Sequence, residues 1–115
     1  MNERIKFLWV EALESGDYIQ AKSALHEDGR YCCLGVLCEL YIQEHSDCEW
    51  KPSHTPGAMS FMNQTAILPN KVWTWAELDG CNPGVIINDE LFPLANHNDC
   101  GASFPEIAKV IREQL

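Results

Sequence analysis

The stretch Arg-Tyr-Cys-Cys-Leu-Gly-Val-Leu-Cys-Glu-Leu-Tyr-Ile, residues 30–42, is the longest apolar run of the chain, interrupted after its first residue only by Gly35 and Glu39. A run of about 12 residues is too long for a buried strand, and it falls short of the about 20 residues that cross a bilayer. Apolar side chains would cover nearly every side of the helix it forms. We therefore predict a helix buried at the centre of the fold.

One narrow stripe of this helix differs from the rest. It carries Cys32, Gly35, Glu39 and Gln43, at spacings of three and four residues. Glycine inside a helix costs about 1 kcal/mol relative to alanine, so Gly35 indicates a packing reason. We expect a neighbouring backbone to approach closely at these small residues.

The remaining patterns predict four further helices or helix-like segments. These are a helix from Glu3 to Glu14 capped by Asn2, a shorter helix from Asp17 to about Leu25 with Gln20 as its capping partner, a short helix over Lys71–Leu78, and a final helix capped by Ser103, where Glu106 completes a capping box.

Strand signals are weaker. We predict two short strands within Met59–Leu68 around Asn63-Gln64, and a third at Val85–Ile87. Turns are expected at 26–29, 82–84 and 98–101. The result is an α+β fold: one mostly helical domain over residues 1–115, with a buried central helix and a small antiparallel sheet.

The composition limits the partners. The chain has 115 residues, a net charge of −9 and a pI near 4.7, which argues against a nucleic acid or an anionic membrane as the partner. The start, Met-Asn-Glu-Arg-Ile-Lys, does not resemble an export signal. We therefore expect a cytoplasmic protein whose six cysteines are reduced thiols.

Residues 30–38, Arg-Tyr-Cys-Cys-Leu-Gly-Val-Leu-Cys, resemble the signature of a family of small uncharacterised proteins of bacteria and their phages. Three other stretches fit the same family: Trp9 with Ala12-Leu13-x-Ser15-Gly16-x-Tyr18, Leu68-Pro69 with Trp75, and Asn98-Asp99-x-Gly101-x-Ser103-Phe104-x-Glu106-Ile107-Ala108. The resemblance implies a small protein encoded by a phage or mobile element, and it carries over no activity. The segment 45–57 has no counterpart in it.

The cysteines offer little chemistry in sequence. Cys32, Cys33 and Cys38 point in different directions on a helix, no C-x-x-C spacing occurs, and we interpret them as buried apolar side chains. The pairs His45-x-x-Cys48 and His97-x-x-Cys100 would form a Cys2His2 zinc site if they met in space, but we predict no metal and no other cofactor. Cys100 beside His97 is the one local pair suited to nucleophilic catalysis.

An anion pocket is the third candidate site. Arg30 directly precedes the central helix, where free N–H groups favour negative charge, and Tyr31, Trp50, Trp73 and Trp75 would supply stacking surfaces. We list Arg30, Tyr31, Trp73, Trp75 and Asp99 as ligand-binding candidates. Lys71 would help by charge. The alternative is that Arg30 is an internal clamp, paired with Glu27, Asp28 or Asp99.

We therefore expect a non-enzymatic binding protein rather than an enzyme. Its concrete form would be a phage counter-defence or host-modulating inhibitor that occludes a host protein or sequesters a small nucleotide signal. The acidic surface favours the protein partner. The alternative is a small thiol- or metal-dependent enzyme that uses Cys100 and His97. The oligomeric state stays open.

Overall fold

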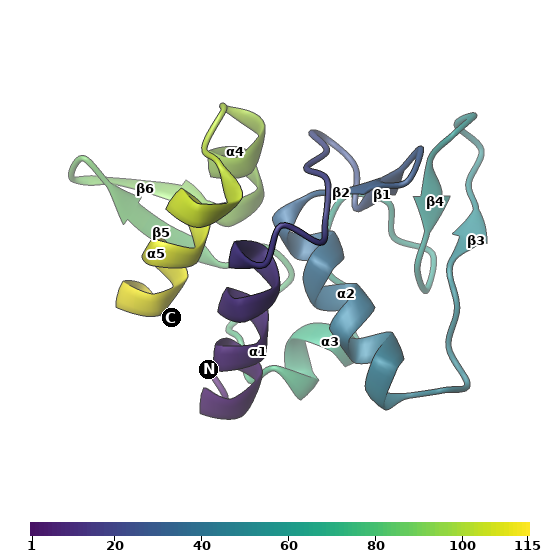
Figure 1. Ribbon diagram of the computed structural model, residues 1–115, viewed down its shortest axis with the longest axis horizontal. Coiled ribbons are helices and arrows are strands. Elements are labelled where there is room, and N and C mark those ends of the chain that lie inside the picture. The colour runs from purple at the N-terminus through teal and green to yellow at the C-terminus, as the bar shows by residue number, and fades with distance from the viewer.

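Five helices and three two-stranded antiparallel ribbons make up the computed structural model, which describes residues 1–115 (Figure 1). The α+β fold class predicted from the sequence is confirmed. In chain order the elements are α1 (Glu3–Glu14), β1 (His26–Glu27), β2 (Arg30–Tyr31), α2 (Cys33–Glu44), β3 (Lys51–Pro52), β4 (Met59–Ser60), α3 (Asn70–Trp75), β5 (Gly84–Ile87), β6 (Glu90–Pro93), α4 (Leu94–Asp99) and α5 (Phe104–Gln114).

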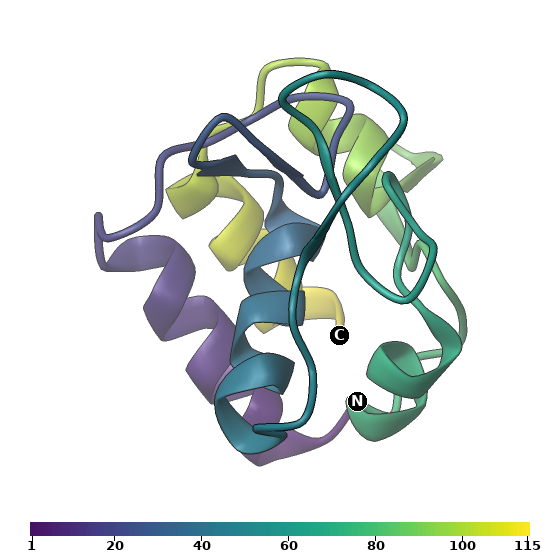
Figure 2. The same ribbon diagram turned by 90° about the vertical axis from the view of Figure 1, so that its right-hand side faces the viewer.

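Helix α2 lies at the centre of the fold, as predicted. It runs between α1 on one side and the β1–β2 and β3–β4 ribbons on the other (Figure 1), and the segment that follows it runs back along its length (Figure 2). Eight of its twelve residues are buried, and seven of these belong to one core cluster of 26 buried residues. The indole Nε1 of Trp9 donates to the Cys33 carbonyl at 2.9 Å, which ties α1 to the first turn of α2.

The start of α2 differs from the prediction by three residues. Arg30 and Tyr31 form β2 and pair with Glu27 and His26 of β1, so the helix begins at Cys33. The turn of this hairpin contains Asp28 and Gly29, both with positive φ. The backbone of Arg30 and Tyr31 therefore pairs within the ribbon and does not extend the helix.

The packing reason expected at Gly35 is present. A Cβ atom added to Gly35 would lie 1.8 Å from the backbone oxygen of Leu25 and 2.7 Å from its carbonyl carbon. Since Leu25 is fully buried, the segment before β1 crosses α2 at the one position that has no side chain.

The predicted helix over Asp17–Leu25 is wrong. The backbone there pairs with distant partners instead of with itself: Ala21 N–H donates to the Tyr31 carbonyl at 2.8 Å, and Leu25 N–H donates to the Thr65 carbonyl at 2.7 Å. Ser23 has a φ of 64°, which no α-helix accommodates. Tertiary hydrogen bonds thus override the local helical pattern.

The predicted strand pair within Met59–Leu68 is also wrong in its pairing. Met59–Ser60 is the only regular strand there, and it pairs with Lys51–Pro52 from the polar segment before it. The turn centres on Met62 and Asn63, both with positive φ, and only an isolated bridge joins Phe61 to Gln64.

The last third of the chain follows the prediction more closely. The short helix is present as α3, the strand at 85–87 is present as β5, and Ser103 with Glu106 forms the predicted capping box of α5. The sequence did not predict α4, and only the last two residues of this helix, Asn98 and Asp99, fall where a turn was expected. The Asn82 side chain accepts from the Ala95 N–H at 3.0 Å and so caps this short helix from outside.

None of these helices combines the length and the apolar character that crossing a membrane would take.

Candidate functional site

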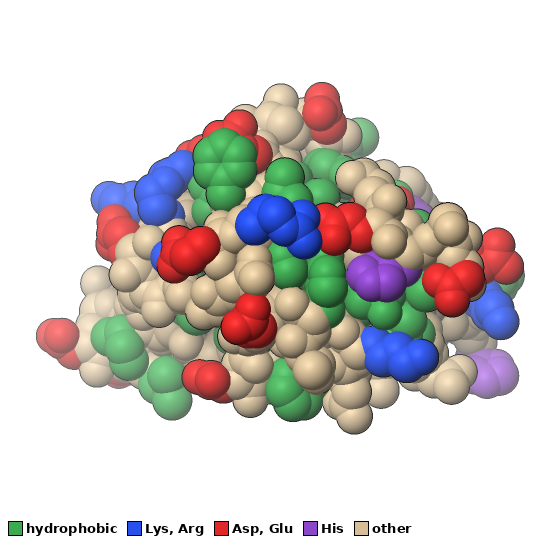
Figure 3. All heavy atoms as spheres, turned by 90° about the horizontal axis from the view of Figure 1, so that it is seen from below, with side chains coloured by type: hydrophobic (Ala, Val, Ile, Leu, Met, Phe, Trp, Pro, Cys, Tyr) green, Lys and Arg blue, Asp and Glu red, His purple; other side chains and the backbone are tan.

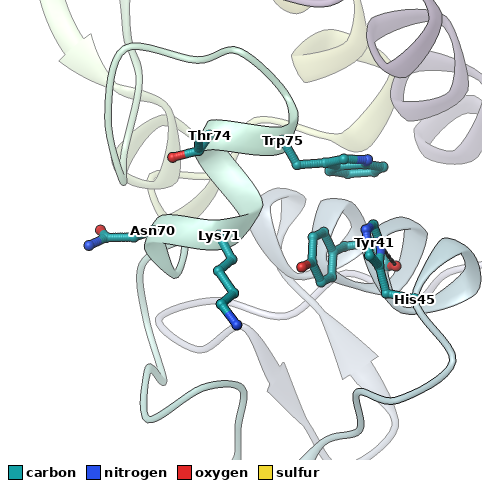
Figure 4. A pocket seen from close by; sticks show the side chains of 6 residues that line it. All are labelled: Tyr41, His45, Asn70, Lys71, Thr74 and Trp75. Atoms are coloured by element: carbon teal, nitrogen blue, oxygen red, sulfur yellow. Dashed lines mark hydrogen bonds between the residues drawn. The ribbon is translucent and has the colours of Figure 1, made fainter.

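An open pocket of about 400 Å³ lies between the C-terminal end of α2 and helix α3 (Figure 4). Its lining combines two aromatic rings, one imidazole, one ammonium group and two small polar side chains. In chain order these residues are Tyr41, His45, Asn70, Lys71, Thr74 and Trp75.

Each helix contributes residues four positions apart, which places them on one face. Tyr41 lies on the last turn of α2 and His45 is the residue that follows the helix; their rings stack with centroids 3.8 Å apart and planes 7° apart. Trp75 stands perpendicular to Tyr41, with centroids 5.2 Å apart. Figure 4 shows the indole of Trp75 above these two rings, with the Lys71 side chain beside them.

The orientation of His45 is fixed by its own helix. Its Nδ1 lies 2.8 Å from the Tyr41 backbone carbonyl. A carbonyl only accepts, so Nδ1 carries the hydrogen, and Nε2 of the neutral ring is left as an acceptor. His45 therefore offers the pocket a flat ring and one free nitrogen.

The charge of the pocket comes from Lys71. The structure contains two ion pairs, Arg4–Glu44 and Arg112–Glu14, and Lys71 takes part in neither. Arg4 holds Glu44 through two hydrogen bonds of 2.6 and 3.0 Å, and this bonding lowers the pKa of Glu44. The carboxylate that lies between Tyr41 and His45 in sequence is therefore paired with a cation of its own.

Cys48 lies near the ammonium group as well. Desolvation and the charge of Asp47 raise the pKa of the Cys48 thiol, and the positive charge of Lys71 opposes that rise. Lys71 is consequently the cation of this region, with Asp47 as the nearby competing anion.

One end of the Asn70 side-chain amide is already hydrogen-bonded within the protein. Its side-chain oxygen accepts from the indole Nε1 of Trp73 at 3.1 Å, which leaves its amide hydrogens available to a ligand. Trp73 packs against the core and does not line the pocket. Trp75 is the one residue of the predicted ligand-binding set that does.

Arg30 and Tyr31 lie elsewhere, in β2. The Tyr31 ring stacks on His26 at 4.2 Å, and its hydroxyl donates to the Glu39 carboxylate at 2.8 Å. Desolvation and this bond raise the pKa of Tyr31 well above its usual value. Arg30 is exposed and forms no ion pair, so the clamp to Glu27, Asp28 or Asp99 is not formed.

Asp99 has a structural position at the end of α4. Its carboxylate accepts from the Ser23 N–H at 2.9 Å and from the Asn98 amide at 3.0 Å. The neighbouring Asn98 is completely buried, and its side chain bonds to Gln20, Ala21 and the N–H of Cys33. These two residues hold the segment before β1 and the start of α2 together.

A row of aromatic rings nonetheless connects the two regions. Tyr31 lies 6.2 Å from Trp50, Trp50 lies 5.3 Å from Phe61, and Phe61 lies 6.1 Å from Tyr41, which reaches Trp75. Within this row the buried indole Nε1 of Trp50 has no hydrogen-bond partner. Of the predicted aromatic residues, Tyr31 and Trp75 thus belong to one row of rings without sharing one pocket.

The two histidine–cysteine pairs do not meet to form a four-ligand site, since no three metal-binding side chains lie together anywhere in the structure. Cys100 is exposed, whereas Cys32, Cys33 and Cys38 are buried, as predicted. Burial raises the pKa of Cys32 to about 11 and raises the pKa values of the other two well above their usual value. These three thiols stay protonated at neutral pH.

Sequence reasoning missed Tyr41, Asn70 and Thr74 and assigned His45 to a metal motif. A signal for most of the pocket was present: two aromatic or basic pairs, Tyr41 with His45 and Lys71 with Trp75, each at a four-residue spacing. What the sequence did not show is that α3 packs against the end of α2.

Comparisons with known proteins give one result for the whole chain. A search of curated proteins and a search of solved structures each found no match. The family model described as "Domain of unknown function (DUF8296)" matches residues 1–115. The chain, with its buried central helix and the pocket at the end of that helix, therefore belongs to the DUF8296 family.

Proposed function

We propose that this chain is a non-enzymatic binding protein that holds a small planar anion of the nucleotide class in the pocket between α2 and α3. The observation that carries the proposal is the combination of Trp75 and Tyr41, two rings at right angles, with Lys71, a lysine that has no carboxylate partner. A planar base packs on aromatic rings, and an ammonium group attracts phosphate.

The polar residues of the pocket complete the set of contacts that such a ligand needs. The free amide hydrogens of Asn70 and the hydroxyl of Thr74 supply donors, and Nε2 of His45 supplies an acceptor. No lining residue is a carboxylate or a thiol, and the Cys100–His97 pair of the enzyme alternative lies outside this pocket. We infer that the pocket binds and sequesters its ligand.

The biological setting of the proposal comes from the motifs of the sequence. Their resemblance to small bacterial and phage proteins supports a cytoplasmic, phage-encoded inhibitor that counteracts host defence by removing a nucleotide signal. Occlusion of a host protein is the second form of this proposal, and the net charge of −9 supports a basic partner for it.

The test is a panel of cyclic and linear nucleotides, with the melting temperature and tryptophan fluorescence as readouts. We expect at least one nucleotide to raise the melting temperature and quench fluorescence. In Lys71→Gln the affinity should fall about tenfold or more, because a charged hydrogen bond is lost. Lys109→Gln, which removes an exposed lysine on α5, is the matched control and should bind as wild type does.

If no nucleotide of a broad panel changes the melting temperature of the wild-type protein, the small-ligand form of the proposal is wrong. Equal loss of affinity in both lysine variants would show a general charge effect and would also count against the pocket. Metal analysis and thiol titration of the same preparations test the enzyme alternative based on Cys100 and His97, which a bound metal or a fast-reacting Cys100 thiolate would support.

A further inference from the structure

The β5–β6 hairpin exposes a face that carries no polar side chain. Side chains alternate between the two faces of a ribbon, so Gly84 and Ile86 share a face with their neighbours across the ladder, Pro93 and Leu91. On this face Ile86 is 50% exposed and Leu91 is 72% exposed, whereas Val85 on the opposite face is only 1% exposed. The solvent side of an antiparallel ribbon is normally polar, whereas the solvent side of this hairpin is apolar.

The apolar face is held in place. The Gln114 side chain at the end of α5 donates to the Ile86 carbonyl at 2.8 Å and accepts from the Ile86 N–H at 2.7 Å, as a neighbouring strand would. The Leu91 side chain lies over Gly84, where an added Cβ atom would be 2.9 Å from Leu91 Cδ1. The backbone that carries the exposed apolar pair is therefore held rigid. A partner that binds it loses little conformational entropy in ordering the hairpin.

Acidic residues flank this face. Between Val72 and Ala108 the sequence contains six acidic residues and neither lysine nor arginine. Asp89 and Glu90 lie at the turn end of the hairpin, and Glu77 and Asp79 share a surface depression with Gly84 at the other end.

The figures show the same arrangement. The hairpin projects from α4 and α5 at the left of Figure 1, and the lower left of Figure 3 shows apolar side chains between acidic ones with no basic side chain beside them. An exposed apolar centre with a charged rim is the usual composition of a protein-binding patch.

We propose that the apolar face of the β5–β6 hairpin, formed by Gly84, Ile86, Leu91 and Pro93, is a docking surface for a basic protein partner. The partner inserts an apolar side chain between Ile86 and Leu91, and its lysine or arginine residues contact the acidic ends of the hairpin. A second copy of this chain fits poorly, because two such faces bring acidic flanks together, and the same charge repels an anionic lipid surface. The inference rests on the protein-partner form of the proposed function, and it does not use the pocket.

The test uses a defined probe, a synthetic peptide of alternating lysine and leucine, titrated into the ¹⁵N-labelled protein and followed by NMR. We expect the largest shift changes at the amides of Ile86 and Leu91, and weaker binding at high ionic strength. A peptide with glutamate in place of lysine and one with serine in place of leucine should each bind about tenfold more weakly. Binding of the glutamate peptide as tightly as the lysine peptide would overturn the basic-partner assignment.

The double variant Ile86→Thr with Leu91→Thr keeps two residues that favour strands while removing the apolar surface. Its affinity for the lysine–leucine peptide should fall about tenfold, with the rest of the NMR spectrum unchanged. Ile19→Thr is the matched control, because Ile19 is 66% exposed at a distant site and its variant should bind normally. Equal binding by the double variant, or shifts that map elsewhere, would refute the docking surface.

Analytical sedimentation tests whether a second copy of this chain occupies the surface instead of a basic partner. A wild-type dimer that the double variant abolishes would identify a second copy as the occupant and overturn the proposal. The nucleotide panel run on the double variant separates this surface from the pocket. Nucleotide binding should persist there, and Lys71→Gln should still bind the peptide.

Discussion

Gly35→Ala tests the central packing contact most directly. In an ordinary helix interior this change stabilises by about 1 kcal/mol. Here the new Cβ would lie 1.8 Å from the Leu25 oxygen, while real Cβ atoms essentially never come within 3.0 Å of another heavy atom. Helix α2 and the Leu25 backbone must therefore separate by more than about 1 Å at a fully buried crossing.

The size of the effect follows from what that separation disturbs. The Leu25 carbonyl accepts from the Cys32 N–H, and the Leu25 N–H donates to Thr65, so neither backbone group moves without losing a buried hydrogen bond. Overpacking of a core costs about 1–3 kcal/mol, and a disturbed buried hydrogen bond adds about 1 kcal/mol or more. After subtraction of the helix gain, we expect a net loss of about 1–3 kcal/mol in the free energy of unfolding.

Urea denaturation measures this loss as a fall of about 1 M in the midpoint, since a domain of this size has a slope of about 2 kcal/mol per M. Gly80→Ala is the control, because an added Cβ there meets nothing within 4 Å and the backbone φ is not positive. It should change stability by less than about 0.5 kcal/mol. A Gly35→Ala protein as stable as wild type would refute the close approach.

Three further predictions concern other parts of the fold. Asn98→Ala should lower the free energy of unfolding by about 3 kcal/mol, because it leaves buried backbone groups unpaired; an unchanged urea midpoint would contradict this role. A thiol reagent at neutral pH should modify the exposed Cys100 at once and Cys32 only after unfolding, because burial raises the pKa of Cys32 to about 11; rapid modification of native Cys32 would show that its burial is not maintained. Arg30→Gln should leave the melting temperature unchanged, because Arg30 is exposed and forms no ion pair. A clear fall in the melting temperature, measured by calorimetry, would instead support an ion pair between Arg30 and Asp99.

The parts of the fold that sequence predicted well depend on local or near-local signals. The apolar run of α2 and the Ser103–Glu106 capping box each carry their own evidence within one or two turns of helix. Even the reason for Gly35 was predictable as a close approach. Its partner, Leu25, was not, because a missing side chain does not say which backbone fills the space.

The parts that failed depend on distant hydrogen bonds. Segment 17–25 has helical spacing in sequence, but Ala21 and Leu25 donate to carbonyls ten and forty residues away. The pocket shows the same division: the spacing of Lys71 and Trp75 is visible in the sequence, whereas the packing of α3 against Tyr41 is decided by the whole core. Local patterns therefore predict faces of helices but not which faces meet.

The Asn98 side chain has a consequence for how the protein is made. Helix α2 has no side-chain cap of its own, and the N–H of Cys33 finds its acceptor in Asn98, 65 residues later in the chain. At synthesis rates of about 5–20 residues per second, Asn98 leaves the ribosome about 3 to 13 s after the start of the central helix. During this interval the most apolar segment of the chain has neither its cap nor α5 to cover it. The nascent protein is therefore most exposed to aggregation, and most dependent on chaperones, while the residues between Glu44 and Asn98 are being translated.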